Sequence, residues 1–158
     1  QPEPNARDAK VLCHTGCAGR ITQYRETNDG RIEMVLSGVC RYDLGEELPT
    51  TRGYRLIVPD WSRFSDDYTN HEDPLRREHD HLIRMLKRYF DAKGLQADWS
   101  MLERLSTVRL MNSLSMALPI SEQDKQLLLE TVEPAQRLHT FTSLLGDGCQ
   151  ASGSVTRH

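Results

Sequence analysis

The sequence predicts an α+β protein, with a β-rich part at the front and a helical part at the back. Strand-like runs separated by turn residues occupy the chain up to residue 72, and apolar residues recur with a helical period from Asp73 onward. We therefore expect a β-rich part over residues 1–72, a helical bundle over residues 73–146 and a disordered, small and polar tail over residues 147–158.

The front part contains a predicted hairpin and one further strand. The runs GRITQYRET and RIEMVLSGVCRYDL are rich in β-branched and aromatic residues, and the turn NDG at residues 28–30 lies between them. The further strand is YRLIVPDW, which we expect Pro59 to end because proline cannot donate to a strand ladder. The recurring glycines predict the bulges and bends of a small closed or half-closed barrel.

The first predicted helix begins at Asp73, which would cap it, with Pro74 at its first position. Gly94 follows as the expected C-cap. Between them, apolar and histidine residues recur at spacings of three and four: Leu75, His79, Leu82, Ile83, Leu86 and Phe90.

Four further helices are predicted after Gly94. Asp98 or Ser100 begins a short one, which VRLMNSLSMAL follows as a second. Ser121 and Asp124 resemble a capping box at the start of EQDKQLLLETV. Pro134 begins the last helix, which we expect to end at Gly146.

Composition and charge exclude some functions. The net charge of −3 gives no electrostatic reason to expect nucleic acid or an anionic membrane. No apolar run approaches the roughly 20 residues that a membrane span needs. The first residues lack a signal-peptide pattern, so we expect a cytoplasmic protein whose four cysteines are reduced thiols.

The stretch CHTGC, residues 13–17, is the first candidate for a metal or redox site. On a strand, Cys13 and Cys17 would share a face with their Cα atoms roughly 13 Å apart, too far for a disulfide or a zinc pair, and His14 would face the other way. Thioredoxin-like chemistry needs two residues between the cysteines, and here there are three. We expect core or strand packing for these cysteines, and no metal.

No other stretch predicts catalysis or a cofactor. In EHDHL, Glu78 and His81 would share a helix face, but the chain has no second Glu-x-x-His for a di-iron site, so a solvated face is favoured. Phosphate-binding loops and serine nucleophile elbows are absent from the sequence. The basic face formed by Arg76, Arg77, Arg84, Lys87 and Arg88 is surrounded by acidic residues and is also expected to be solvated.

Aromatic residues suggest a contact surface. Trp61, Phe64 and Tyr68 lie in the connection between the two parts, where core burial is not guaranteed. Two alternatives remain open: they clasp the helical part to the β-rich part, or they line an exposed groove for unfolded segments.

Several motifs, in order, resemble one family. GCAGRI, followed by ETNDGRIEMVLSGVCRYDL with Leu36, Gly38 and Arg41, is similar to the front of the Lon-type substrate-binding domain. LMNSLSMALPISEQDKQLLLE, with its K-Q-x-L-L-E run at residues 125–130, is similar to the helical half of that domain. YRLIVPDWSRF resembles the stand-alone bacterial branch, and the resemblance spans residues 11–145.

The resemblance implies a PUA-like pseudo-barrel followed by a helical bundle. It implies recognition of unfolded or apolar polypeptide segments, without catalytic residues or a cofactor. The nucleotide-binding loop and Ser–Lys protease segment of Lon are absent from this sequence, so protease activity is not implied. Binding residues are taken from the expected apolar surface: Tyr24, Met34, Tyr42, Trp61, Phe64 and Tyr68.

One departure from the family carries an expectation about assembly. The family's domain opens with strands and an F-E-x-R-Y-like stretch that lie before the point at which this sequence begins. A barrel without those strands would expose an unpaired edge. We therefore expect the 158-residue chain to self-associate through that edge or to belong to a longer molecule.

The leading hypothesis is a non-enzymatic module that binds unfolded or apolar segments and passes them to a separate protease. An RNA-binding module is the alternative, because PUA-like barrels often bind RNA, but arginines and acidic residues are mixed in the β-rich part. A small hydrolase is a third hypothesis, supported only by scattered serines and histidines.

Overall fold

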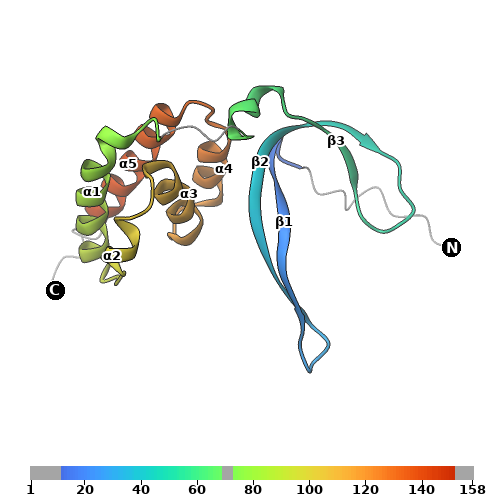
Figure 1. Cartoon of the computed structure of the whole chain (residues 1–158), viewed down its shortest axis with the longest axis horizontal. Helices are drawn as coiled ribbons and strands as arrows, with labels where there is room; N and C mark the ends of the chain where they lie inside the picture. Colours follow the sequence, from blue (N-terminus) through green and yellow to red (C-terminus); the bar gives the residue numbers. More distant parts are fainter. Residues whose placement is uncertain (1–11, 69–72, 152–158) are drawn as a thin grey trace. The chain divides into compact units, whose positions relative to one another are not determined.

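The protein has two compact units in a computed structural model that describes residues 12–68 and 73–151. Residues 1–69 form the β-rich unit, and residues 70–158 form the helical unit (Figure 1). The described part of the first unit contains an antiparallel sheet and that of the second contains the α-helices, which confirms the α+β class. The assignment of residues 1–72 and 73–146 to two parts of one domain stays a prediction.

The β-rich unit is built on one three-stranded sheet. Its strands are β1 (Thr15–Glu26), β2 (Ile32–Leu48) and β3 (Leu56–Asp60), antiparallel and in the order β1-β2-β3. The predicted hairpin is confirmed, and both of its strands are longer than expected. Gly30 takes the positive φ of 77° that the turn requires. Figure 1 shows β1 and β2 as a long curved ribbon whose turn lies far from β3.

The sequence predicted a strand end at Pro59 and bulges in the sheet. Pro59 does not end the third strand: it lies inside β3, opposite Leu44. A proline is tolerated there because β3 is an edge of the sheet that the described residues form. The expected bulges occur between Ala18 and Gly19, between Ile21 and Gln23, and between Leu44 and Glu47.

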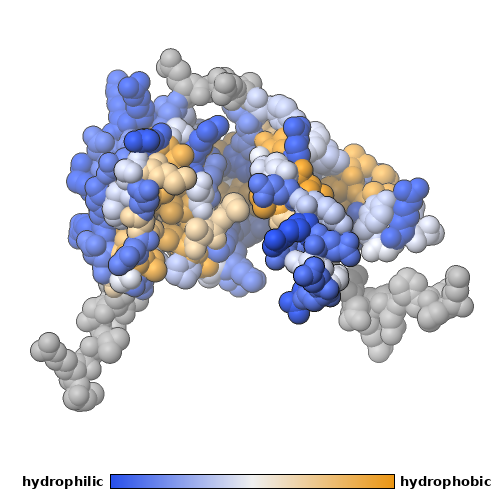
Figure 2. Space-filling model, turned by 60° about the horizontal axis from the view of Figure 1, so that its bottom comes forward, coloured by the Kyte–Doolittle hydropathy of each residue, from blue (hydrophilic) through white to orange (hydrophobic). Residues whose placement is uncertain are grey.

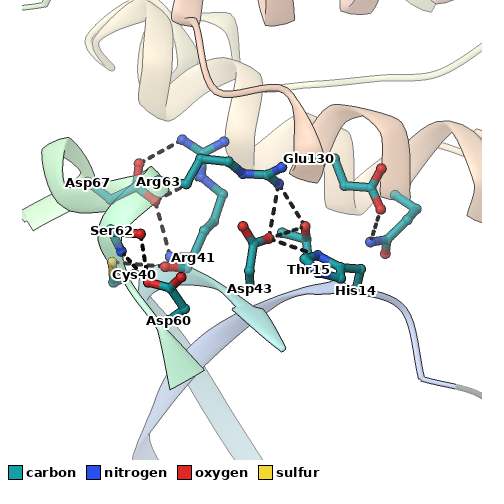
Figure 3. Close-up of polar contacts among 11 residues, drawn as sticks. His14, Thr15, Cys40, Arg41, Asp43, Asp60, Ser62, Arg63, Asp67 and Glu130 are labelled. Atoms are coloured by element: carbon teal, nitrogen blue, oxygen red, sulfur yellow. Dashed lines mark hydrogen bonds and ion pairs between the residues drawn. The ribbon is translucent and has the colours of Figure 1, made fainter. Parts of the chain in front are cut away.

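A buried arginine holds the segment after β3 against β2. This segment is a 3₁₀ stretch, η1 (Ser62–Tyr68), with a kink at Phe64. The Nε and Nη2 atoms of Arg41 donate to the two carboxylate oxygens of Asp67 at 2.8 and 2.7 Å, and its backbone amide donates to Asp67 at 3.1 Å (Figure 3). The Arg41 guanidinium also lies 4.5 Å from the centre of the Phe64 ring.

A second polar cluster ties the start of β1 and η1 to Asp43 of β2. The Thr15 hydroxyl donates to Asp43 Oδ1 at 2.7 Å, and Arg63 Nη2 lies 3.1 Å from the same oxygen. Arg63 Nη2 also donates to the Thr15 hydroxyl at 2.9 Å, and His14 Nδ1 lies 3.3 Å from Asp43 (Figure 3). These contacts fix the position of η1 relative to the sheet.

The helical unit packs its α-helices around one apolar core. The buried core residues include Leu82 and Leu86 of the first helix and Phe141 of the last, in agreement with the predicted spacing. Helical elements of this unit are η2 (Arg76–Glu78), α1 (His79–Lys93), α2 (Trp99–Leu102), α3 (Thr107–Ala117), α4 (Glu122–Glu130) and α5 (Pro134–Ala151).

Most of the predicted caps are confirmed. Gly94 ends α1 with a left-handed φ of 63°, and Asp98 accepts a hydrogen bond from the Met101 amide at the start of α2. The Ser121 hydroxyl oxygen accepts from the Asp124 amide at 3.1 Å, as in a capping box. These side chains satisfy amide and carbonyl groups that helix ends leave without partners.

The first and last helices differ from the prediction at one end each. The α-helix α1 begins at His79, because the residues after Asp73 form a turn and then η2. Asp73 Oδ1 accepts from the Leu75 amide, and its Oδ2 accepts from the Thr107 amide at 2.6 Å, so it fixes two segments. The last helix, α5, continues past Gly146 to Ala151, so a disordered tail from residue 147 is wrong; residues 152–158 lie outside the described chain.

No helix in the described part of the chain has the length and apolar character that crossing a membrane requires.

Two glycines of α5 provide a test of the packing between α5 and α1. A Cβ atom at Gly148 would lie 2.6 Å from the ring of the buried Tyr89, whereas one at Gly146 would meet nothing within 4 Å. Gly148→Ala should lower the free energy of unfolding by about 1–3 kcal/mol, because the ring has little room to move. Gly146→Ala should raise it by about 0.5–1 kcal/mol through helix propensity. Urea denaturation followed by circular dichroism measures both, and equal effects would contradict the packing.

The Arg41–Asp67 pair provides a second test. Asp67→Asn removes the negative charge beside an arginine side chain that is only 7% exposed, and should lower the free energy of unfolding by about 3 kcal/mol. Glu33→Gln is the matched control, because Glu33 pairs with Arg25 on the exposed hairpin. This substitution should lower the free energy of unfolding by at most about 1 kcal/mol. A loss at Asp67 no larger than that at Glu33 would show that the buried pair does not hold η1.

Candidate polypeptide-binding site

One face of the β1–β2 hairpin carries apolar side chains that reach solvent. Tyr24 pairs with Met34 and Ile21 pairs with Leu36, and directly opposed residues project from the same side of a sheet. Ile32 lies two residues from Met34 and therefore shares this side. We call these five residues the hairpin face; their exposure ranges from 49% at Met34 to 63% at Tyr24.

A bulge brings Ile21 and Tyr24 to the same side. In a regular strand, residues three positions apart point to opposite faces. Here the register shifts between Ile21 and Gln23, so Thr22 is an extra residue, and its hydroxyl donates to the Val35 carbonyl at 3.2 Å. The bulge therefore makes the apolar side of the hairpin continuous.

The opposite side of the same hairpin is mostly polar. Arg25 forms an ion pair with Glu33, and Arg20 is opposite Ser37. Val35 is the apolar exception, with 48% of its surface exposed. The hairpin is therefore amphipathic, and Figure 2 shows orange apolar residues at the surface of the β-rich unit beside blue hydrophilic ones.

An open groove of about 690 Å3 lies between the sheet and η1 within the β-rich unit. Apolar and aromatic side chains dominate its lining, and Cys40, which is only 2% exposed, lies at its base. The lining residues are Ala18, Gly19, Arg20, Val39, Cys40, Trp61, Ser62, Ser65 and Tyr68. Arg20 and Ile21 are neighbours before the bulge, so Arg20 leaves the sheet on the side opposite the hairpin face.

The aromatic wall of the groove is held from two sides. Trp61 packs edge-to-face on Tyr42, with ring centres 5.5 Å apart and an interplanar angle of 66°. Asp60 accepts hydrogen bonds from the Ser62 hydroxyl at 2.7 Å and the Ser62 amide at 2.9 Å, which fixes the turn into η1. These two bonds, the hydroxyl first, hold the pKa of the Asp60 carboxyl below its usual value.

The six residues predicted to bind polypeptide fall into three groups. Tyr24 and Met34 lie on the hairpin face, while Trp61 and Tyr68 line the groove and half-buried Tyr42 supports Trp61. Phe64 does not belong to an exposed surface, because it is 1% exposed and packs against Arg41 and Arg63. Whether the other five bind polypeptide stays a prediction.

Sequence reasoning missed four residues of these surfaces. Ile21, Ile32 and Leu36 complete the hairpin face, and Arg20 contributes the charge of the groove. The alternation in RIEMVLS places Ile32, Met34 and Leu36 on one side, so these could have been found. The side on which Ile21 lies depends on the bulge, which the sequence pattern does not reveal.

The cysteines near the N-terminus are arranged differently from the prediction. The strand begins at Thr15, so Cys13 precedes it, and both Cys13 and Cys17 are exposed free thiols. Cys17 therefore lies in a strand, as one of the two expected kinds of packing requires, but neither Cys13 nor Cys17 is in the core; the buried thiol is that of Cys40. Among residues 12–68 and 73–151, no group of three or more histidine, cysteine or acidic side chains is placed to hold a metal ion.

Thiol labelling tests the burial of Cys40 beneath the groove. Burial, and secondly the negative charge of Asp67, raise the pKa of the Cys40 thiol above its ordinary value, so little thiolate forms at neutral pH. Iodoacetamide should therefore label Cys40 more than about tenfold more slowly than Cys13 and Cys17, as measured by peptide mass spectrometry. Concentrated guanidinium chloride should remove the difference. Equal rates in the native protein would contradict the buried position.

Comparison with known proteins agrees with this architecture. A family model described as the ATP-dependent protease La (LON) substrate-binding domain matches residues 1–147. Comparison with curated protein sequences gives no match.

Two similar solved structures are N-terminal domains of Lon proteins. The Lon N-terminal domain protein from Xanthomonas campestris has a TM-score of 0.61 and 23% identity over 84% of this chain and 69% of that one. The N-terminal domain of the Mycobacterium avium complex Lon protease has a TM-score of 0.58 and 18% identity over 85% of this chain and 70% of that one. The structures support the fold and the family model spans most of the sequence, so this chain belongs to the Lon substrate-binding domain family.

Proposed function

We propose that this protein binds polypeptide segments with exposed apolar side chains and does not catalyse a reaction on them. The hairpin face carries the proposal, because five large apolar side chains, each about half exposed, lie together on one side of a two-stranded ribbon. Apolar patches of this kind on a protein surface mark interaction sites. Membership of a substrate-binding family supports the same conclusion.

The bound segment would lie extended beside β1. β1 pairs with β2 along one edge, and no strand among the described residues pairs with its other edge. An added strand would gain main-chain hydrogen bonds there and place alternate side chains on the hairpin face. Apolar contact and main-chain bonding depend little on sequence, so binding should be weak and tolerant of the segment's composition.

The groove would form a second contact area, with Trp61 and Tyr68 as its aromatic side chains and Tyr42 packed against Trp61. Aromatic side chains provide a large contact area at a low cost in side-chain entropy. Binding to two surfaces on opposite sides of the sheet would hold a flexible segment more firmly than either one alone.

The cellular setting that we propose is a reducing cytoplasm, in which bound segments are passed to a separate protease. The exposed free thiols of Cys13 and Cys17 suit such a compartment. RNA is not favoured as the ligand, because most described arginines of the β-rich unit, including Arg25, Arg41 and Arg63, are paired with a carboxylate. A salt-sensitive RNA surface needs several arginines that are free to contact phosphates.

Neighbouring residues on the two sides of β2 provide a sharp test. Met34 and Val35 are equally exposed, at 49% and 48%, but only Met34 lies on the hairpin face. Met34→Ser should weaken binding of a permanently unfolded protein, such as reduced and carboxymethylated lactalbumin, by about fivefold, which corresponds to about 1 kcal/mol of lost apolar burial. Val35→Ser should leave the affinity unchanged. Fluorescence anisotropy with the 158-residue chain measures both.

Circular dichroism spectra of the two variants should match that of the unchanged protein. Equal losses from Met34→Ser and Val35→Ser would mean that the hairpin face is not the binding surface. No binding of the unfolded protein at high micromolar concentration would overturn the proposed function itself.

A further inference from the structure

We propose that the groove selects polypeptide segments in which an acidic residue lies next to apolar side chains. This inference rests on the proposed function and adds a preference that apolar contact alone does not give. It is carried by the one charged side chain in the groove lining, that of Arg20.

Arg20 differs from most described arginines of the β-rich unit in having no acidic partner among the described residues. Five others form ion pairs with a nearby carboxylate: Arg25 with Glu33, Arg31 with Asp29, Arg41 with Asp67, Arg55 with Glu47 and Arg63 with Asp43. Arg20 forms no ion pair with any described residue, and no acidic residue is among those that line the groove. Its positive charge is therefore not balanced locally and is available to an anionic group of a ligand.

The surroundings of Arg20 make a carboxylate a better partner than water alone. The guanidinium can donate two parallel hydrogen bonds to a carboxylate, a geometry that favours glutamate or aspartate over a neutral amide. Ser65 also lines the groove, and its hydroxyl makes no hydrogen bond with the described residues, so it can donate as well. The Ser62 hydroxyl is already used, because it donates to Asp60.

The rest of the groove is suited to apolar side chains. Trp61, Val39 and Tyr68 contribute apolar surface, and the volume of about 690 Å3 is within the range of sites that enclose small ligands. This space holds a few side chains and not a folded domain. An acidic residue in contact with Arg20 would therefore have its apolar neighbours against the aromatic wall.

Four forms of the 158-residue chain and two short peptides test the inference. The peptides share an apolar aromatic sequence, have amidated C-termini, and differ only in one central residue, which is Glu in the first and Gln in the second. Arg52→Gln is the matched control for Arg20→Gln, because Arg52 is exposed and does not line the groove, and its guanidinium contacts only the Tyr54 hydroxyl among the polar groups of the described residues. The fourth form is Trp61→Ala.

The unchanged protein should bind the Glu peptide about three- to tenfold more tightly than the Gln peptide, as expected for a charge-assisted hydrogen bond in a partly apolar site. Arg20→Gln should abolish this preference, and Arg52→Gln should keep it. Trp61→Ala should weaken both peptides by the same factor, because it removes apolar contact only. Fluorescence anisotropy in low-salt buffer gives all eight dissociation constants.

A third peptide, with the central Gln and a free C-terminal carboxylate, separates the two sources of a carboxylate. If this peptide binds more tightly than the amidated Gln peptide, and Arg20→Gln removes the difference, the groove binds chain ends. The assignment to an acidic side chain is then overturned. Equal binding of the Glu and Gln peptides, or loss of the preference in Arg52→Gln as well, would overturn this inference while leaving the proposed function intact. Failure of all three peptides to bind would overturn both.

Discussion

The contact of Arg41 with Asp67 and Phe64 is the constraint on which the groove depends. An arginine with almost no exposed surface is stable only if its charge is paired and its donors are used, and Asp67 meets both needs. Because Asp67 and Phe64 belong to η1, the same contact fixes η1 over the sheet. Because η1 is held in this way, Trp61, Ser65 and Tyr68 line a groove; without the contact they would belong to a loop that is not attached to the sheet.

The β1–β2 hairpin, in contrast, keeps apolar side chains exposed on one of its sides. Its two strands alternate between an apolar and a polar side, and half of each apolar side chain stays in solvent within the described structure. Exposed apolar side chains cost stability in an isolated domain. Their concentration on one side of the hairpin is therefore typical of a contact surface. The helical unit shows the opposite arrangement, with its apolar stripes turned inward to a single core.

Much of the secondary structure could be predicted because it depends on local chemistry. Asn28, Asp29 and Gly30 permit the tight turn, and Gly94 and Ser121 end or begin helices by satisfying backbone groups near them. Where tertiary contacts compete with local preference, the predictions failed. Asp73 also binds the Thr107 amide, and α1 starts later than its sequence signal suggests.

The sequence by itself determined the α+β class, the hairpin, the helical core and, through the order of its motifs, the family. Alternation along one strand is a local property, so the sequence could also have shown that Met34 shares a strand face with Ile32 and Leu36, which the predicted binding residues omitted. Tertiary structure alone decided that Phe64 is buried, that Cys17 is exposed and that Arg20 lines a groove with no acidic partner in the part of the chain that the structure describes. Each of these depends on bulges, or on contacts between residues far apart in sequence, and neither leaves a periodic trace in the chain.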